Sequence, residues 1–557
     1  MILQALCDYY DRLDDKPAYG FAETNVGGCI VLKPDGSVAS IVSFAEGKVK
    51  GRRIMTPMQP KRSSGIRAAF LCDNAGYFLG LDEKNGTVKR SASAKLHHEI
   101  LDGVTDSAVS ALLAFFDSIP EYEDGAMPGG NLVFRVEGMA GFVHDIPAIK
   151  ELWEKYTESE FADGNLAQCL VTGEAAPVAR LHGSLPGFGQ DKPTLVSFNK
   201  DSFVSFRKNQ GENAPISELA AFKYVTALSA LINDSRHIFR LGSDKVVFWA
   251  EKEAIIEEHL FEILVSPAGL DNPSSEHMKE MLESIFAGKM PKGLNCDVTF
   301  CLLGVSTNRT RLVLRFFYCN TFGHILESYM QHLSDIEIIP DFRGKSSTAP
   351  IEILLETAVE HKYDNIPPLI ESALMRSIFW NTVYPYNLYM SILNRVRAEA
   401  RVNQVRAGML KGYINRNNRL NNREEMMTVG LNPEEKNQGY LLGRMFALFE
   451  KAQYAALGKV NATVVDKYLN SALATPQNVF PMLTTLFEKH IAKAEAYYLK
   501  KNMAEIIEKI PSSGYPQTLN AEDQGRFIIG YYHQKYYKAY GEQDEAVETV
   551  NEEQESE

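Results

Sequence analysis

The chain has 557 residues, of which 45% are hydrophobic and 23% are charged, and its formal net charge is −13. This composition is typical of a globular protein, and the length exceeds what one hydrophobic core supports, so about two to four domains are expected. No apolar run approaches the roughly 20 residues that span a bilayer, and the N-terminus lacks the pattern of a signal peptide. We therefore expect a cytoplasmic protein without a membrane partner.

Strand signals come first along the chain. Short segments rich in β-branched and aromatic residues predict strands at 29–33, 38–44, 131–136, 195–199, 203–206 and 246–249. The turn sequence at 33–37 joins the first two into a hairpin, and 306–310 joins a second hairpin between 298–305 and 311–318. Helices are predicted at 105–118, 217–233, 275–286 and 351–361. Because strands and helices do not alternate regularly, an α+β fold is favoured over a doubly wound sheet.

After about residue 385, helical periodicity replaces the strand signals. Apolar residues recur along 479–494 at the spacing of one helix stripe, and further helices are predicted at 437–457, 461–474 and 521–540. Thr463 and Asp466 have the spacing of a capping box. We predict a mixed α+β module over 1–425, with sub-domains near 1–125, 126–290 and 291–425, then a helical bundle over 426–540. The acidic segment 541–557 is predicted to be disordered.

The seven cysteines are spread over the chain without a C-x-x-C spacing: Cys7, Cys29, Cys72, Cys169, Cys296, Cys301 and Cys319. Their odd number and scatter argue against a disulfide framework and against a structural zinc site. We expect buried, reduced thiols that behave as small apolar side chains.

A local excess of positive charge lies between residues 48 and 67. This window contains seven cations and no acid: Lys48, Lys50, Arg52, Arg53, Lys61, Arg62 and Arg67. In a chain of negative net charge, such a window is typical of contact with a phosphate backbone. A solvated basic loop is the alternative.

Asn74 lies in the otherwise apolar segment 70–79. An asparagine amide can pair with adenine in the major groove, or donate and accept in the minor groove. The alternative is that Asn74 satisfies backbone groups of a turn.

A second cationic region, 395–423, holds eight bases against one acid, Glu399. Arg416, Arg419 and Arg423 would share one helix face, as in a helix that contacts a nucleic-acid strand or guide, or in a solvated linker. Aromatic residues precede this region: Phe379, Trp380, Tyr384, Tyr386 and Tyr389. They could stack on bases or belong to the core.

Catalytic motifs are absent from the sequence. No P-loop, H-E-x-x-H or G-x-S-x-G pattern occurs. The pair His144–Asp145 and the run 97–99 are isolated, whereas a two-metal nuclease needs several convergent ligands. We expect no catalytic residue, no metal site and no cofactor. A metal-dependent nuclease built on His144 and a purely architectural protein remain the alternatives.

Distinct blocks of sequence, in a fixed order, extend along nearly the whole chain. They are MILQAL (1–6), KRSSGIR (61–67), FLCDNAGYFLGLD (70–82), CLVTGE (169–174), LVSFN (195–199), QGENAPIS (210–217) with AAF (220–222), VVFWAE (246–251), RSI (376–378), NRVRAE (394–399), YLLGR (440–444), and ATP (474–476) with VFP (479–481). Together they resemble the large subunit of the type I-C CRISPR surveillance complex (Cascade), the Csd-one-like family. Two segments depart from the family pattern: 181–194 lacks its basic character, and 67–69 replaces a stretch with an expected proline or asparagine.

The resemblance implies a non-catalytic subunit of an RNA-guided complex that recognises the protospacer-adjacent motif in duplex DNA. It also implies assistance in duplex opening and in recruitment of a helicase-nuclease for antiviral defence. The implied partners are target double-stranded DNA, guide RNA, and the backbone, handle-binding and small subunits. The C-terminal bundle resembles the small subunit, and separate synthesis from Met426 or Met427 would fit that likeness.

We assign three sets of residues to nucleic-acid contact. Motif recognition is predicted for Asn74, Lys61, Arg62, Ser63 and Ser64. DNA-backbone contacts are predicted for Lys48, Lys50, Arg52, Arg53 and Arg67. Strand or guide contacts are predicted for Arg416, Arg419 and Arg423.

Overall fold

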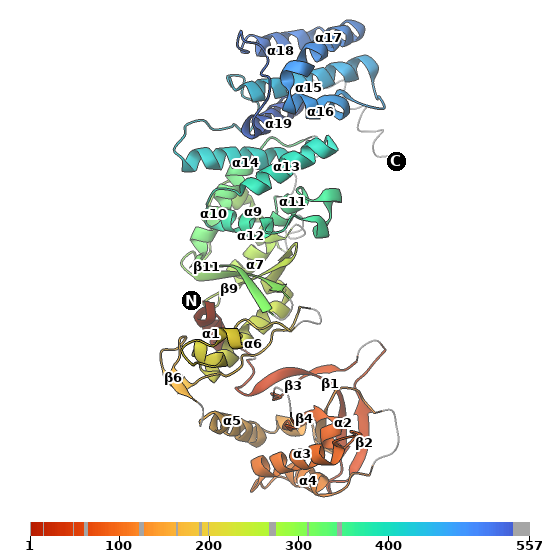
Figure 1. Ribbon diagram of the computed structural model, residues 1–557, viewed down its shortest axis with the longest axis vertical. Coiled ribbons are helices and arrows are strands. Elements are labelled where there is room, and N and C mark those ends of the chain that lie inside the picture. The colour runs from red at the N-terminus through yellow and green to blue at the C-terminus, as the bar shows by residue number, and fades with distance from the viewer. Residues whose placement is uncertain are drawn as a thin grey trace. The chain divides into compact units, whose positions relative to one another are not determined.

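The computed structural model describes residues 2–14, 16–47, 50–60, 65–121, 127–162, 165–188, 192–198, 200–266, 275–308, 311–341 and 348–537. The chain forms two compact units, Met1–Asn233 with Thr307–Leu312, and Asp234–Ser306 with Val313–Glu557. Strands concentrate in the first half and helices dominate toward the C-terminus (Figure 1). The predicted α+β class is therefore confirmed. Within the described part of the chain, no helix is long and apolar enough to cross a membrane.

The first unit is built on one mixed sheet. Its strands are β1 (Phe21–Leu32), β2 (Val38–Ser43), β3 (Arg52–Pro57), β4 (Cys72–Asn74) and β5 (Asn131–Val136). Their order is β2-β1-β5-β4, and β3 pairs with the first half of β1. Strand β1 runs antiparallel to β2 and β3 but parallel to β5. The long β1 therefore joins the basic strand β3 to the opposite half of the sheet.

The two faces of this sheet have different covers. Helices α3 (Gly86–Leu101) and α4 (Ser107–Asp117) pack on one face, where Ile30, Phe115 and Phe134 are fully buried. The second face has a smaller apolar cluster, formed by Val26, Cys29, Val31, Cys72 and Val133. Part of the second face is therefore left for polar side chains.

The other elements of the first unit surround the sheet. They are α1 (Ile2–Arg12), α2 (Ala75–Phe78), α5 (Pro147–Ala162), β6 (Leu166–Gln168), β7 (Ala175–Pro177) and α6 (Glu218–Asn233). Strands β6 and β7 form a two-stranded ribbon, and α1 packs against α6. The Cys7 thiol on α1 donates a hydrogen bond to the Ala220 carbonyl on α6, 3.5 Å away.

The second unit combines a four-stranded sheet with many helices around one continuous core. The strands are β8 (Ile238–Leu241), β9 (Asp244–Ala250), β10 (Thr299–Asn308) and β11 (Arg311–Thr321), in the order β11-β10-β9-β8. The helices before the bundle are α7 (Ile255–Val265), α9 (Glu276–Phe286), α10 (Phe322–Ile336), α11 (Pro350–Leu355), α12 (Ile370–Phe379), α13 (Tyr386–Glu399) and α14 (Gln404–Leu420). The bundle contains α15 (Gln438–Leu457), α16 (Val464–Ala474), α17 (Pro476–Ala494), α18 (Tyr498–Ile507) and α19 (Ala521–Tyr536). The capping box predicted at Thr463 and Asp466 is present.

Most predicted elements are confirmed, including both hairpins, and two strands are wrong. The described residues of 195–199 and of 203–206 form no strand, and Asp201–Phe203 is a 3-10 turn. Strand formation depends on packing against neighbouring strands, and the described residues of these segments form only an isolated bridge, between Ser205 and Lys208. The helix predicted at 351–361 ends at Leu355, and Glu360 beyond it has a positive φ of 56°.

The predicted domain boundaries stay predictions. Residues 234–306 and 313–425 belong to the same compact unit as the helical bundle, and α14 packs against α19 of the bundle. The acidic segment 541–557 lies outside the described residues.

One pair of cysteines corrects the expectation of free thiols. Cys301 on β10 and Cys319 on β11 form a disulfide, with Cα atoms 4.2 Å apart. The two cysteines are 18 residues apart in the sequence. They come together because β10 and β11 are neighbouring strands of one hairpin, in which opposite residues lie side by side. Among the other cysteines, Cys7, Cys29, Cys72 and Cys169 are free and buried, as expected.

Glycines allow a very close crossing of α15 and α19. A Cβ atom on Gly443 would lie 1.9 Å from the Phe527 carbonyl oxygen, and one on Gly530 would lie 2.2 Å from the Tyr440 carbonyl oxygen. Both neighbours are backbone atoms, so the helices would have to separate.

We therefore expect Gly443→Ala to lower the free energy of unfolding by about 3 kcal/mol, although helix propensity alone favours alanine by about 1 kcal/mol. Denaturant titration measures the change. The exposed Ala455 on the same helix supplies the control, because Ala455→Gly reports propensity only. A stabilising effect of Gly443→Ala would contradict the close crossing.

Candidate nucleic-acid interface

Part of the predicted interface lies outside the described residues. Lys48, Lys61, Arg62, Ser63 and Ser64 are among the residues left undescribed, so their contacts stay predictions. The rest of the basic window is exposed on and around β3: Lys50, Arg52, Arg53 and Arg67. The charge that the sequence indicates is therefore available at the surface of the first unit.

The loop before Asn74 is held by a buried carboxylate. Asp73 is fully buried, and its Oδ2 and Oδ1 accept hydrogen bonds from the Ala69 and Asn74 backbone N–H groups, both at 2.8 Å. Gln59 Nε2 donates to the Cys72 carbonyl at 2.8 Å. Because Gln59 follows β3 and Cys72 begins β4, this bond joins the segment after β3 to the strand that ends at Asn74.

Asn74 has the turn role that was the alternative to base contact. It is the N-cap of α2, and its Oδ1 accepts a hydrogen bond from the Gly76 N–H at 3.0 Å. No described residue accepts a hydrogen bond from its Nδ2, and the side chain is only partly buried. The cap leaves the donor end of the amide available, so base contact by Asn74 stays a prediction.

Strand register places Asn74 and Arg52 in one row on the second face of the sheet. Arg52 lies opposite Val26, Val26 opposite Asn131, and Asn131 opposite Asn74. Residues directly opposite each other in neighbouring strands point to the same face, and the buried Val26 identifies this face as the second one. With strands about 4.8 Å apart, the row from Arg52 to Asn74 is roughly 14 Å long.

The charged side chains that the strands present on the second face are arginines. Arg135 on β5 lies opposite Val31 and is exposed. The described strand residues that point to this face include no Asp or Glu. Arg52 and Arg135 therefore give the face a positive potential that favours a phosphate backbone.

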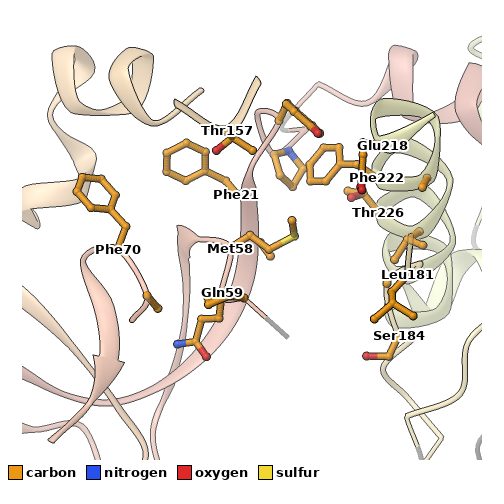
Figure 2. Close-up of a pocket in the computed structure, with 18 of the residues that line it drawn as sticks. Phe21, Met58, Gln59, Phe70, Thr157, Leu181, Ser184, Glu218, Phe222 and Thr226 are labelled. Atoms are coloured by element: carbon orange, nitrogen blue, oxygen red, sulfur yellow. The ribbon is translucent and has the colours of Figure 1, made fainter. Parts of the chain in front are cut away.

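Arg53 points to the opposite face from Arg52. Its Nη1 lies 3.2 Å from Glu23 Oε2, and both residues line a cleft of about 1770 Å³ in the first unit. Figure 2 shows Phe21, Met58 and Gln59 on one side of this cleft and Leu181, Ser184 and Phe222 on the other. The segment 181–194 departs from the family pattern, and its residues Leu181, Ser184 and Lys192 are among those that line this cleft.

The three arginines predicted on one face of a helix have different environments. Arg416 is fully buried, with Nε 2.6 Å from Asp335 Oδ2, and Arg419 Nη2 lies 3.1 Å from the same oxygen. Arg416 Nη1 also donates to the Ser377 carbonyl at 2.6 Å. These bonds give Arg416 a structural role, because contact with a strand or guide would require the cluster to open. Arg423 follows the helix and is exposed, so its predicted contact remains open.

The aromatic cluster before α13 belongs mainly to the core. Phe379, Tyr384 and Tyr389 are buried, whereas Tyr386 is 57% exposed. Trp380 packs against Tyr318, with ring centroids 4.2 Å apart. The core interpretation is therefore confirmed for the buried members.

The isolated histidines of the sequence have structural surroundings. His144 is 1% exposed and stacks on Phe142, and burial lowers the pKa of His144 to about 4. The neighbouring Asp145 carboxylate accepts a hydrogen bond from the Phe142 N–H at 3.0 Å. In the described part of the chain, no group of three or more His, Cys, Asp or Glu residues is arranged to hold a metal ion.

Asn131 and Arg135 lie on this face but were not predicted from the sequence. The position of Asn131 at the start of a correctly predicted strand gave no functional signal. Only the pairing of β5 with β4 brings it beside Asn74, and that register is not visible in the sequence.

Comparison with known proteins identifies one family. A family model described as CRISPR-associated protein (Cas_Csd1) matches residues 6–537. No curated protein matches the chain.

Proposed function

The chain belongs to the Csd1 family of CRISPR-associated proteins, and we propose that it is the motif-reading large subunit of a type I-C RNA-guided complex. In this proposal the second face of the sheet in the first unit contacts duplex DNA next to the target. Asn74 contacts base edges, and Lys50, Arg52 and Arg135 contact phosphates. Guide pairing then supplies the remaining sequence recognition.

The observation that carries the proposal is the shared face of Asn74 and Arg52. Sequence alone singled out both residues, and strand register independently places them in one row. Phosphate contacts position a protein on DNA, whereas contacts to base edges specify sequence. A face with an arginine at one end of a row and an asparagine amide at the other can serve both needs.

The proposal includes partners and steps that follow from the family resemblance. The chain would assemble with guide RNA and with backbone, handle-binding and small subunits, help to open the duplex, and help to recruit a helicase-nuclease in the cytoplasm. It would itself be non-catalytic. The helical bundle would follow the displaced strand, with the exposed Arg423, which precedes the bundle, as a candidate contact.

Salt dependence tests the phosphate contacts. We expect Lys50→Gln with Arg52→Gln to lower the salt slope of duplex binding by the assembled complex by about 2, since each phosphate contact contributes roughly 0.9. Filter-binding titrations at several salt concentrations measure the slope. Arg53→Gln is the matched control, because Arg53 is exposed on the same strand but points to the other face.

The outcomes separate the proposal from its alternatives. An unchanged slope for the Lys50 and Arg52 variant would remove this face from the DNA interface. Equal losses for Arg52→Gln and Arg53→Gln would show contact around the strand edge, as the sequence analysis predicts. Binding that is independent of any flanking motif would favour an architectural subunit.

A further inference from the structure

A second asparagine lies beside Asn74 on the second face. Asn131 is the first residue of β5 and pairs directly with Asn74 of β4. Opposite Cα atoms in an antiparallel pair are about 4.5–5.5 Å apart. The rise between base pairs is about 3.4 Å. The two side chains can span the difference between this rise and the separation of their Cα atoms. Two such amides can therefore contact neighbouring base pairs.

The amide of Asn131 is available for a ligand. It is partly exposed, and no described residue forms a hydrogen bond with either of its polar atoms. The Gly129 carbonyl packs closely on Gly27, but a Cβ atom on Gly129 or Gly130 would meet nothing within 4 Å. A nucleic acid could thus approach this end of β5 without a clash with described residues.

Asparagine is a poor choice for the position on structural grounds alone. It is depleted in strands, and here its amide supports no described turn, cap or partner. Its neighbour Asn74, in contrast, caps α2. A residue with low strand propensity and no structural role is expected at functional positions.

We propose that Asn131 is a second base-reading residue, which contacts the base pair next to the one contacted by Asn74. This inference rests on the proposed function, because it requires duplex DNA on the second face. Asn74 Oδ1 already accepts the bond from Gly76, so Asn74 offers mainly its Nδ2 donor. Asn131 offers both a donor and an acceptor, the combination that a bidentate contact with a base edge needs.

The test is a binding selection with the assembled complex, its guide RNA, and duplexes that carry the matching target and randomised flanking base pairs. The variants are Asn131→Leu, which keeps the size of the side chain but removes its amide, Asn131→Ser, and Asn74→Leu. Asn25→Leu is the control, because Asn25 is exposed on β1 but faces the other way, opposite Arg53. Thermal unfolding of each variant verifies that it is folded.

We expect both Asn131 variants to reduce discrimination at one flanking position by about tenfold or more, with the salt slope unchanged. Asn74→Leu should relax the adjacent position, and Asn25→Leu should relax none. If the folded Asn131 variants keep full discrimination while Asn74→Leu loses it, the inference about Asn131 is wrong and the proposed function stands. If the unmodified complex shows no flanking preference, the proposed function fails first.

Discussion

Replacing Arg416 with methionine should lower the free energy of unfolding by about 3–5 kcal/mol, because it leaves a buried carboxylate without its closest partner. Asp335 is 3% exposed, and its Oδ2 accepts hydrogen bonds from Arg416 at 2.6 Å and from Arg419 at 3.1 Å. The Arg416 guanidinium also lies 4.1 Å from the centre of the Tyr384 ring. Methionine fills similar volume but restores none of these bonds. Denaturant titration of the full chain measures the loss.

A double-mutant cycle isolates the ion pair from the packing. Asp335→Leu alone leaves the Arg416 charge buried and should cost as much as Arg416→Met, while the combined variant should cost clearly less than the sum. Arg423→Met is the control, since Arg423 is exposed just beyond the same helix. Equal stability of the Arg416 and Arg423 variants would contradict the buried pair. It would also return Arg416 to the candidates for nucleic-acid contact.

The Arg416 cluster shows why helix periodicity gives only half of the information about a charged face. The spacing of Arg416, Arg419 and Arg423 predicts a common side of the helix, but not whether that side meets solvent or core. The deciding partner, Asp335, is 81 residues away in sequence. Lys411 on the same helix is also buried, at 2% exposed, and burial lowers its pKa to about 8. Periodicity succeeded on α17, where apolar residues identify the buried side directly.

The sheet of the first unit shows the same limit for strands. The sequence identified β1, β2 and β5 and singled out Arg52, Arg53 and Asn74. Strand alternation implies that Arg52 and Arg53 face opposite ways, but only the register shows which of them shares a face with Asn74. Register between strands that are distant in sequence depends on tertiary packing. The amide of Asn131 could therefore be found only from the structure.

Acid should destabilise both units through four buried histidines, one of which is His144, whose burial lowers its pKa to about 4. Burial lowers the pKa of His97 to about 4 and that of His533 to about 3, and it lowers the pKa of His332 well below its ordinary value. In the unfolded chain each histidine binds a proton near pH 6.5, whereas the folded chain stays neutral until the lower pKa. The folded state thus binds fewer protons in this window, so stability falls as the pH decreases from about 6.5 to about 4. Each fully buried histidine contributes on the order of 3 kcal/mol to this loss.

His97 shows why the neutral form is required. Its Nε2 accepts a hydrogen bond from the Leu71 N–H at 3.0 Å, so its Nδ1 must donate to the Ser93 carbonyl, 2.7 Å away. Protonation of Nε2 would break its hydrogen bond with the Leu71 N–H, in the loop that leads to Asn74. We therefore expect His97→Gln to reduce the pH dependence of stability in the first unit between pH 6.5 and 4, with the remainder contributed by His144.

The measurement is denaturant unfolding across this pH range, compared with His277→Gln, which replaces an exposed histidine and should keep the full slope. Identical slopes for the two variants would place the acid-sensitive groups elsewhere. A reduced slope for His97→Gln would show that the loop carrying Asn74 depends on a neutral imidazole, and motif-dependent DNA binding should then weaken over the same pH interval.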